Sequence, residues 1–192
     1  MEAEPSGAVR NWWRRLHKDR GDSRAAKARL RRCSSILEAL LLEATHDLIM
    51  NVRRTSFRSS RDFEQRLAVL AMTLAHVDGA SPISIARALG QTAGRRAATN
   101  GDRPRLSPAR FGALLRAAHT RDWDAFARRL RRALAILGDA PIDVRLLIDD
   151  VLFLNQATLQ RWTYDYWQTR APTQMSDDET TEPDPSEMDT TP

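Results

Sequence analysis

The spacing of apolar residues between positions 123 and 137 constrains the fold of this chain more than any other feature. In WDAFARRLRRALAIL the apolar side chains recur every three to four residues, and the four arginines fall on the opposite arc of a helix. The same period governs most of the sequence, and no run of alternating, β-branched residues marks a strand. We therefore expect an all-α fold.

Capping residues and turn residues divide the chain into the expected helices. These helices cover residues 7–18, 25–33, 36–54, 62–77, 82–90, 109–119, 123–137, 144–154 and 156–170. Ser6, Asp122 and Asn155 are candidate N-caps, and either Asp143 or Pro141 begins the helix over 144–154. Residues 90–107 contain Gly, Pro, Asn and several arginines, which is typical of a basic loop. We expect two small helical bundles that share an interface, an N-terminal bundle in 1–100 and a C-terminal bundle in 101–170.

Charge is distributed unevenly along the chain. Residues 171–192 contain seven acidic residues and no Lys or Arg, so residues 1–170 hold 30 basic against 18 acidic residues, a net charge of +12. A polar segment without an apolar period predicts a disordered acidic tail at 171–192. The strongly basic remainder favours a polyanionic partner such as nucleic acid.

The residues that would support other classes of function are absent or isolated. Cys33 is the single cysteine, no signal peptide or membrane-spanning stretch is visible, and we expect a cytoplasmic protein that does not contact a membrane. The four histidines are not at metal-ligand spacing, and no catalytic or nucleotide-binding motif is present. Asp149 and Asp150 read as helix-surface acids or as partners of Arg145. We therefore expect no metal, no cofactor and no enzymatic activity.

Seven motifs follow one another in a fixed order within residues 9–168. They are LRRC (30–33), LAVLAMTLAHVDG (67–79), SIARALG (84–90), ARFGALLRA (109–117), RLRRALAIL (129–137), IDVRLLIDDVLFLN (142–155) and RWTYDYW (161–167). Together they resemble the CasB family, the small subunit of the type I-E CRISPR interference complex Cascade. The acidic tail has no counterpart in this resemblance.

The resemblance implies a non-catalytic, all-helical subunit that is present in two copies per complex and packs on other Cascade subunits. It also implies basic side chains that bind the guide RNA and the target and displaced DNA strands and so stabilise the R-loop. By motif position these side chains are Arg32, Arg61, Arg87, Arg110, Arg116, Arg121, Arg131 and Arg132. Arg128 joins them as part of the positive face of 123–137, and Arg95, Arg96, Arg103 and Arg105 join them on charge alone.

Two other interpretations of the basic residues stay open at this point. A free-standing helical nucleic-acid-binding regulator would need a recognition helix that offers polar side chains to base edges. A scaffold would use the arginines to dock on acidic partner subunits.

Overall fold

The computed structural model describes residues 4–18, 21–55, 62–79, 81–91, 104–138 and 140–167. These residues form ten helices and no strand, which confirms the all-α expectation. The helices are α1 (Pro5–Leu16), α2 (Gly21–Arg32), α3 (Ile36–Leu40), α4 (Glu43–Arg53), α5 (Phe63–Leu74), α6 (Ile85–Gly90), α7 (Pro108–His119), α8 (Trp123–Leu137), α9 (Val144–Leu152) and α10 (Gln156–Trp167). No helix in the described ranges is long and apolar enough to cross a membrane.

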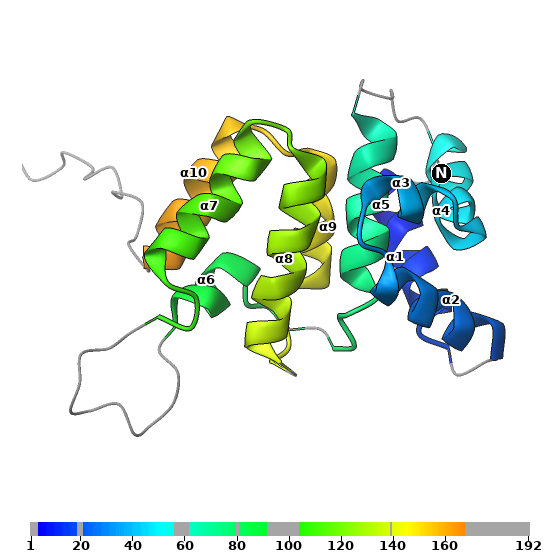
Figure 1. Ribbon diagram of the computed structural model, residues 1–192, viewed down its shortest axis with the longest axis horizontal. Helices are drawn as coiled ribbons and strands as arrows, with labels where there is room; N and C mark the ends of the chain where they lie inside the picture. The colour runs from blue at the N-terminus through cyan, green and yellow to red at the C-terminus, as the bar shows by residue number, and fades with distance from the viewer. Residues whose placement is uncertain are drawn as a thin grey trace, which may run out of the picture.

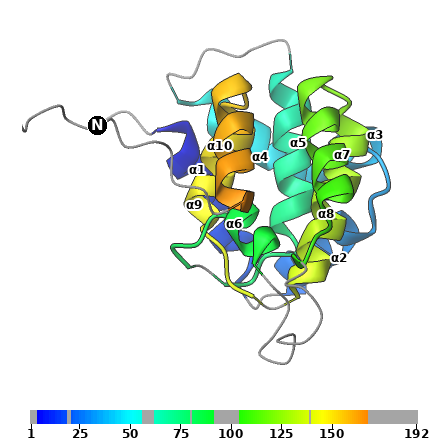
Figure 2. The ribbon, with the colours of Figure 1, turned by 90° about the vertical axis from the view of Figure 1, so that its left-hand side faces the viewer.

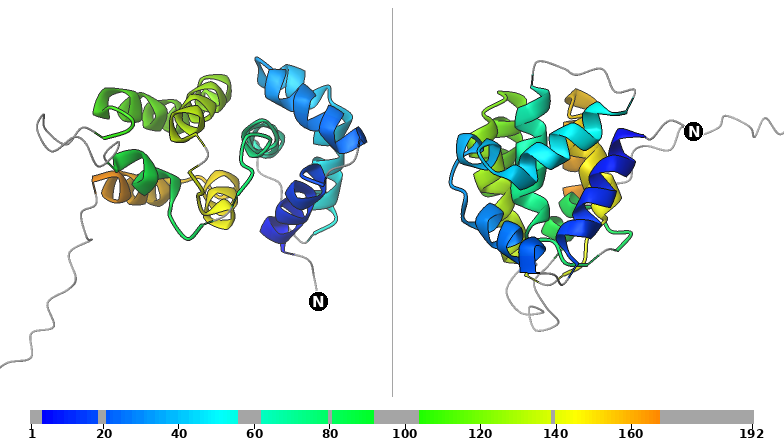
Figure 3. Two further views of the ribbon diagram at one scale, coloured as in Figure 1. Left: turned by 90° about the horizontal axis from the view of Figure 1, so that it is seen from below. Right: turned by 90° about the vertical axis from the view of Figure 1, so that its right-hand side faces the viewer.

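The helices form two groups that lie side by side, α1–α5 and α6–α10 (Figures 1 and 3). α5 packs against α8 and α9, α1 also packs against α9, and α3 contacts α8, so these five helices form most of the interface between the groups. α6 packs on α10, α7 and α8 and therefore belongs with the second group. The expected boundary at residue 100 lies outside the described residues.

The buried residues make one continuous core across both groups. α5 lies near the middle of the molecule (Figure 2), and every residue from Leu67 to Leu74 is buried. A helix that is apolar on all sides is stable only when other helices surround it. Its neighbours α2, α3 and α4 cover it on one side, and α8 and α9 cover it on the other. The two groups are thus held together mainly by shared apolar burial.

Several expected caps are confirmed. The side chain of Asp122 accepts a hydrogen bond from the backbone nitrogen of Ala125 at 3.0 Å, and Asp143 and Asn155 cap α9 and α10 in the same way. The expectation for Ser6 is wrong, because α1 begins at Pro5 and Ser6 lies buried within the helix. Proline is suited to that first position because its missing N–H would have had no partner there.

The expected helix over 36–54 is interrupted. Leu41 ends α3, and Leu42 adopts an extended conformation (φ −88°, ψ 133°) before α4 begins. The interruption lets α4 pack along α1, where the indole nitrogen of Trp12 donates a hydrogen bond to the carbonyl oxygen of Ala44 at 2.9 Å. Neither Gly nor Pro marks this break, so tertiary contacts override the local helical pattern.

The aromatic residues of α10 anchor the second group. Trp162 and Tyr166 are buried, and the ring of Tyr166 stacks on Phe111 of α7 with 4.0 Å between the ring centroids. Asp150 of α9 is also buried, where it accepts a hydrogen bond from the indole nitrogen of Trp162 at 2.6 Å and pairs with Arg161. The expectation of a surface acid or a partner of Arg145 is therefore wrong for Asp150.

Candidate nucleic-acid interface

The solvent-facing side of α8 carries three of its four arginines. Arg128, Arg129 and Arg132 are exposed, and no carboxylate in the described part of the chain pairs with them. The opposite side of α8 is buried, as its apolar period predicts. Guanidinium groups in this position have hydrogen-bonding capacity that only solvent or an external partner can use.

Arg131 points away from that face and toward the first group of helices. Its guanidinium donates hydrogen bonds to the carbonyl oxygens of Arg31 and Cys33, and its Nε donates to Nε2 of His76 at 3.3 Å. The last carbonyls of a helix lack intrahelical partners, so a cation at the C-terminal end of α2 is favourable. The sequence placed Arg131 among the outward-facing arginines; its side chain instead joins α8 to α2.

Asp124 makes a matching contact about two turns before Arg131 on the same edge of α8. Its Oδ1 accepts a hydrogen bond from the backbone nitrogen of Ile36, the first residue of α3, at 2.7 Å. A carboxylate at a helix N-terminus satisfies a free donor and interacts favourably with the helix dipole. The two contacts hold the α2–α3 connection against α8. Arg128 lies between them on this edge by helical spacing. Arg32, the last residue of α2, is also exposed.

α7 adds two further arginines on the other side of α8. Arg110 and Arg116 are exposed on α7, which packs along α8 on the side away from α2 (Figure 1). Arg129 lies on the edge of α8 nearer to α7 by helical spacing. Three neighbouring helices thus present exposed arginines that no carboxylate of the described residues neutralises. We call this set the arginine surface; its members are Arg32, Arg110, Arg116, Arg128, Arg129 and Arg132.

The remaining candidates are placed differently. Arg87 is exposed on α6, and Arg105 is half-buried before α7 with an Nε atom that has no hydrogen-bond partner. Arg121 has a positive φ of 57° and pairs with Asp62 at 3.0 Å, so part of its charge is neutralised within the chain. Four candidates, Arg61, Arg95, Arg96 and Arg103, lie outside the described residues.

A carboxylate lies at the centre of a basic cluster near the end of α5. Asp78 pairs with Lys27 and with Arg31 at 3.3 Å, and Nδ1 of His17 lies 2.9 Å from its carboxylate. Burial pushes the pKa of Asp78 up, but the hydrogen bond and charge of Lys27, together with the charge of Arg31, outweigh burial and hold that pKa below its usual value. The cluster therefore ties α1 and α2 to the end of α5.

The same cations border a basic depression that sequence reasoning missed. A cavity of about 400 Å³ is lined by Leu16, His17, Lys18, Arg24, Lys27, Ala28, Arg31 and Arg32. Lys27 and Arg31 are four residues apart, and this i, i+4 spacing was the available signal that they share a face of α2. Arg32 belongs to both the depression and the arginine surface, so positive potential extends from α8 around the end of α2.

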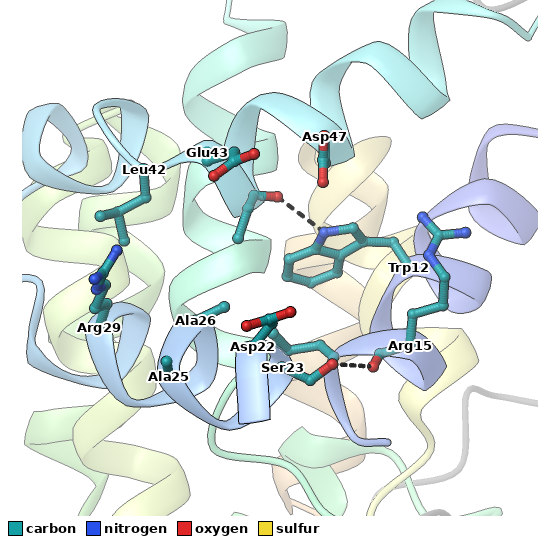
Figure 4. Close-up of a pocket in the computed structure, with 12 residues that line it drawn as sticks. Trp12, Arg15, Asp22, Ser23, Ala25, Ala26, Arg29, Leu42, Glu43 and Asp47 are labelled. Carbon is teal, nitrogen blue, oxygen red and sulfur yellow. Dashed lines mark hydrogen bonds between the residues drawn. The ribbon is translucent and has the colours of Figure 1, made fainter. Parts of the chain in front are cut away.

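A larger pocket on the first group of helices has mixed charge (Figure 4). It has a volume of about 530 Å³ and lies between α1, α2 and the start of α4, with Trp12 in its lining. Arg15 and Arg29 face it, but so do Asp22, Glu43 and Asp47. Three carboxylates beside two arginines would repel a phosphate backbone, so this pocket does not extend the arginine surface.

The described residues contain no group of three or more His, Cys, Asp or Glu side chains that could hold a metal ion. His17 makes structural contacts within the first group of helices. Its Nε2 lies 3.0 Å from the carbonyl oxygen of Leu74, which can only accept, so Nε2 carries the proton. Nδ1 then accepts a hydrogen bond from Lys27 at 3.1 Å. Burial lowers the pKa of His17 and favours this neutral form.

Comparison with protein families matches residues 26–167 to the family described as CRISPR-associated protein Cse2. The matched range begins within α2 and ends at the last residue of α10, so it contains every residue of the arginine surface. No curated protein and no solved structure matches the chain.

Proposed function

Because the chain belongs to the Cse2/CasB family of the type I-E CRISPR system and is thus a Cascade subunit in CRISPR defence, we propose that its arginine surface binds nucleic-acid backbones. Binding there stabilises the R-loop, and the subunit acts without catalysing a reaction. Its partners are the guide RNA, the target and displaced DNA strands and the other Cascade subunits, and two copies per complex would double the length of the surface.

One observation carries this proposal: six exposed arginines on three neighbouring helices have no carboxylate partner among the described residues. A guanidinium group is planar and matches two phosphate oxygens at once, which makes arginine well suited to backbone contacts. Such contacts position a strand but carry no sequence information. A surface of this kind therefore suits a complex in which base pairing with a guide supplies the specificity.

The energetics of strand exchange make weak contacts sufficient. Replacing a DNA duplex with a guide–target heteroduplex is close to balanced in free energy, so modest protein contacts to the strand backbones tip the equilibrium. Each phosphate neutralised on a single strand lowers the slope of log affinity against log salt by about 0.7. Six arginines would therefore give a slope of about −4.

The start of α8 argues against the alternative of a free-standing regulator. A recognition helix presents its N-terminal residues to base edges in the major groove. In this chain those residues include Asp122 and Asp124, and both carboxylates already accept backbone hydrogen bonds. Phosphates flanking the groove would also repel them. The scaffold alternative predicts instead that the arginines pair with carboxylates of partner subunits.

The test replaces Arg128, Arg129 and Arg132 with Gln in the full chain and reconstitutes the Cascade complex. We expect the complex to assemble at its normal size while R-loop formation on target DNA, followed by permanganate reactivity of the displaced strand, falls about tenfold or more, since each backbone contact contributes on the order of 1 kcal/mol. The loss should shrink as salt is raised.

A matched control removes three charges from other places. Arg14 of α1, Arg54 after α4 and Arg145 of α9 are also exposed, so their replacement with Gln lowers the net charge equally. We expect this variant to form R-loops nearly as well as the native chain. Equal losses in both variants would indicate a general charge effect and contradict a localised surface. Failed assembly of the first variant alone would favour the scaffold alternative.

A further inference from the structure

We infer that the chain's own acidic segment, residues 171–192, binds the arginine surface and competes there with nucleic acid. The inference rests on the proposed function for its consequence, but the contact itself can be measured without nucleic acid. The acidic segment is then an internal competitor that lowers the affinity of this subunit for non-specific strands.

The charges of the two parts are complementary. Residues 171–192 contain Asp177, Asp178, Glu179, Glu182, Asp184, Glu187 and Asp189 and no basic residue, whereas residues 1–170 have a net charge of +12. The seven carboxylates fall within 13 consecutive residues, 177–189, so their charge density resembles that of a short single strand. A positive surface attracts such a segment from within a Debye length, about 10 Å at 0.1 M salt.

The arginine surface lacks internal partners for a specific structural reason. Asp122 and Asp124 are the carboxylates nearest to it along α8, but Asp122 caps α8 itself and Asp124 caps α3. Like charges one turn apart on α8, such as Arg128 and Arg132 or Arg129 and Arg132, repel by a few tenths of a kcal/mol per pair. An anionic segment relieves this repulsion, and the described residues contribute none at this place.

The acidic segment starts close enough to reach the surface. The described chain ends at Trp167, the last residue of α10, and α10 packs against α7, which packs against α8. Asp177 lies ten residues beyond Trp167 and Asp189 lies 22 residues beyond it. At about 3.4 Å per residue these carboxylates can reach up to about 35 Å and about 75 Å from the end of α10. A small domain has a diameter of about 30 Å, so the reach covers both α7 and α8.

Covalent attachment makes even weak pairing effective. A tethered segment has an effective concentration on the order of 1 mM at a site within its reach. If the free segment binds with a dissociation constant of about 0.1 mM, the tethered segment occupies the surface most of the time and weakens competing nucleic-acid binding roughly tenfold. Nucleic acid still displaces it in the assembled complex, where the guide holds the strands in place.

The first experiment measures this competition in the full-length chain. All seven acids of residues 171–192 are replaced with Asn or Gln, and binding of a fluorescein-labelled oligothymidylate of about 20 nucleotides is followed by anisotropy at low salt. We expect roughly tenfold tighter binding than for the native chain. The matched control reorders residues 171–192 while keeping their composition, and it should bind like the native chain.

The same measurement is repeated with Arg128, Arg129 and Arg132 replaced by Gln. If the acids act by occupying this surface, neutralising them should now improve oligothymidylate binding by less than about threefold, since the contact is already lost. An undiminished tenfold improvement would show long-range repulsion in place of a contact and would overturn the inference.

The second experiment needs no nucleic acid. A labelled peptide of residues 171–192 is titrated into the chain whose own acids have been neutralised, and its anisotropy is measured. We expect saturable, salt-sensitive binding that weakens at least fivefold when Arg128, Arg129 and Arg132 are Gln. Peptide binding without any oligothymidylate binding would leave this contact standing and sink the proposed function. No peptide binding, or binding indifferent to these arginines, would overturn the contact itself.

Discussion

The guanidinium of Arg131 donates a hydrogen bond to the carbonyl oxygen of Cys33, a residue 98 positions earlier in the chain. Together with its contact to the carbonyl of Arg31, this bond makes one arginine of a positive cluster a structural link between the two groups of helices. Burial lowers the pKa of Arg131, yet an arginine stays charged at any physiological pH. Its neighbours Arg128 and Arg132 are exposed and can bind a partner outside the chain.

This difference predicts that two adjacent substitutions affect different properties, the first stability and the second nucleic-acid binding. Arg131→Ala should lower the free energy of unfolding in urea by about 2 kcal/mol, because helix carbonyls lose a charged donor. Arg132→Ala should change stability by less than about 0.5 kcal/mol but weaken oligothymidylate binding. Circular dichroism during urea titration gives the first quantity and anisotropy gives the second. Equal stability losses for both variants would contradict the structural role of Arg131.

His76 makes stability depend on pH in a defined window. Burial first, and then the charges of Arg131 and Arg31, lower the pKa of His76 to about 4, whereas an unfolded chain has a histidine pKa of about 6.5. Between these values the unfolded state binds more protons, so stability rises with pH. The contribution of neutral His76 is therefore fully present above about pH 6.5 and is lost as the pH falls toward about 4. Protonation also removes the acceptor that Nε2 offers to Arg131.

The check is a series of urea titrations between about pH 4.5 and 7.5. The midpoint for the native chain should fall as the pH is lowered, and the fall should be smaller in His76→Gln, which keeps an acceptor but does not titrate. His17 has a pKa lowered by burial as well, so some pH dependence should remain in the variant. An identical pH dependence in both proteins would assign the effect to other groups.

Sequence periodicity predicted the class of fold because the apolar spacing depends only on local geometry. It also identified the caps Asp122, Asp143 and Asn155, since each bonds to a backbone nitrogen three residues later. It could not predict the break at Leu41 and Leu42, which depends on where α1 lies. Local pattern carries no information about the element that packs against a given helix edge.

The same limit explains which residues of the candidate site the sequence predicted correctly and which it did not. Periodicity placed four arginines of 123–137 on one arc, and three of them are exposed as that arc requires. Arg131 lies at the border of the arc, where the neighbouring α2 decides its direction. Asp150 likewise pairs with Arg161 of the next helix and not with Arg145 of its own helix. Contacts between helices decide such border positions, and one sequence does not reveal them.

Gly90 yields a prediction about the packing that supports α7 and α10. It is the last residue of α6, and a Cβ atom built there would lie 1.9 Å from the carbonyl oxygen of Tyr166. The nearest atoms belong to backbone, so no side-chain rotation can relieve the clash, and α6 and α10 must separate. Gly90→Ala should therefore lower the free energy of unfolding by about 2–3 kcal/mol.

Gly7 of α1 has no atom within 4 Å of its built Cβ and provides the control. Gly7→Ala should be neutral or stabilising by up to about 1 kcal/mol, because alanine favours the helix. Urea titrations of both variants measure these changes, and a Gly90→Ala chain as stable as the native one would show that α6 does not pack on α10 this closely.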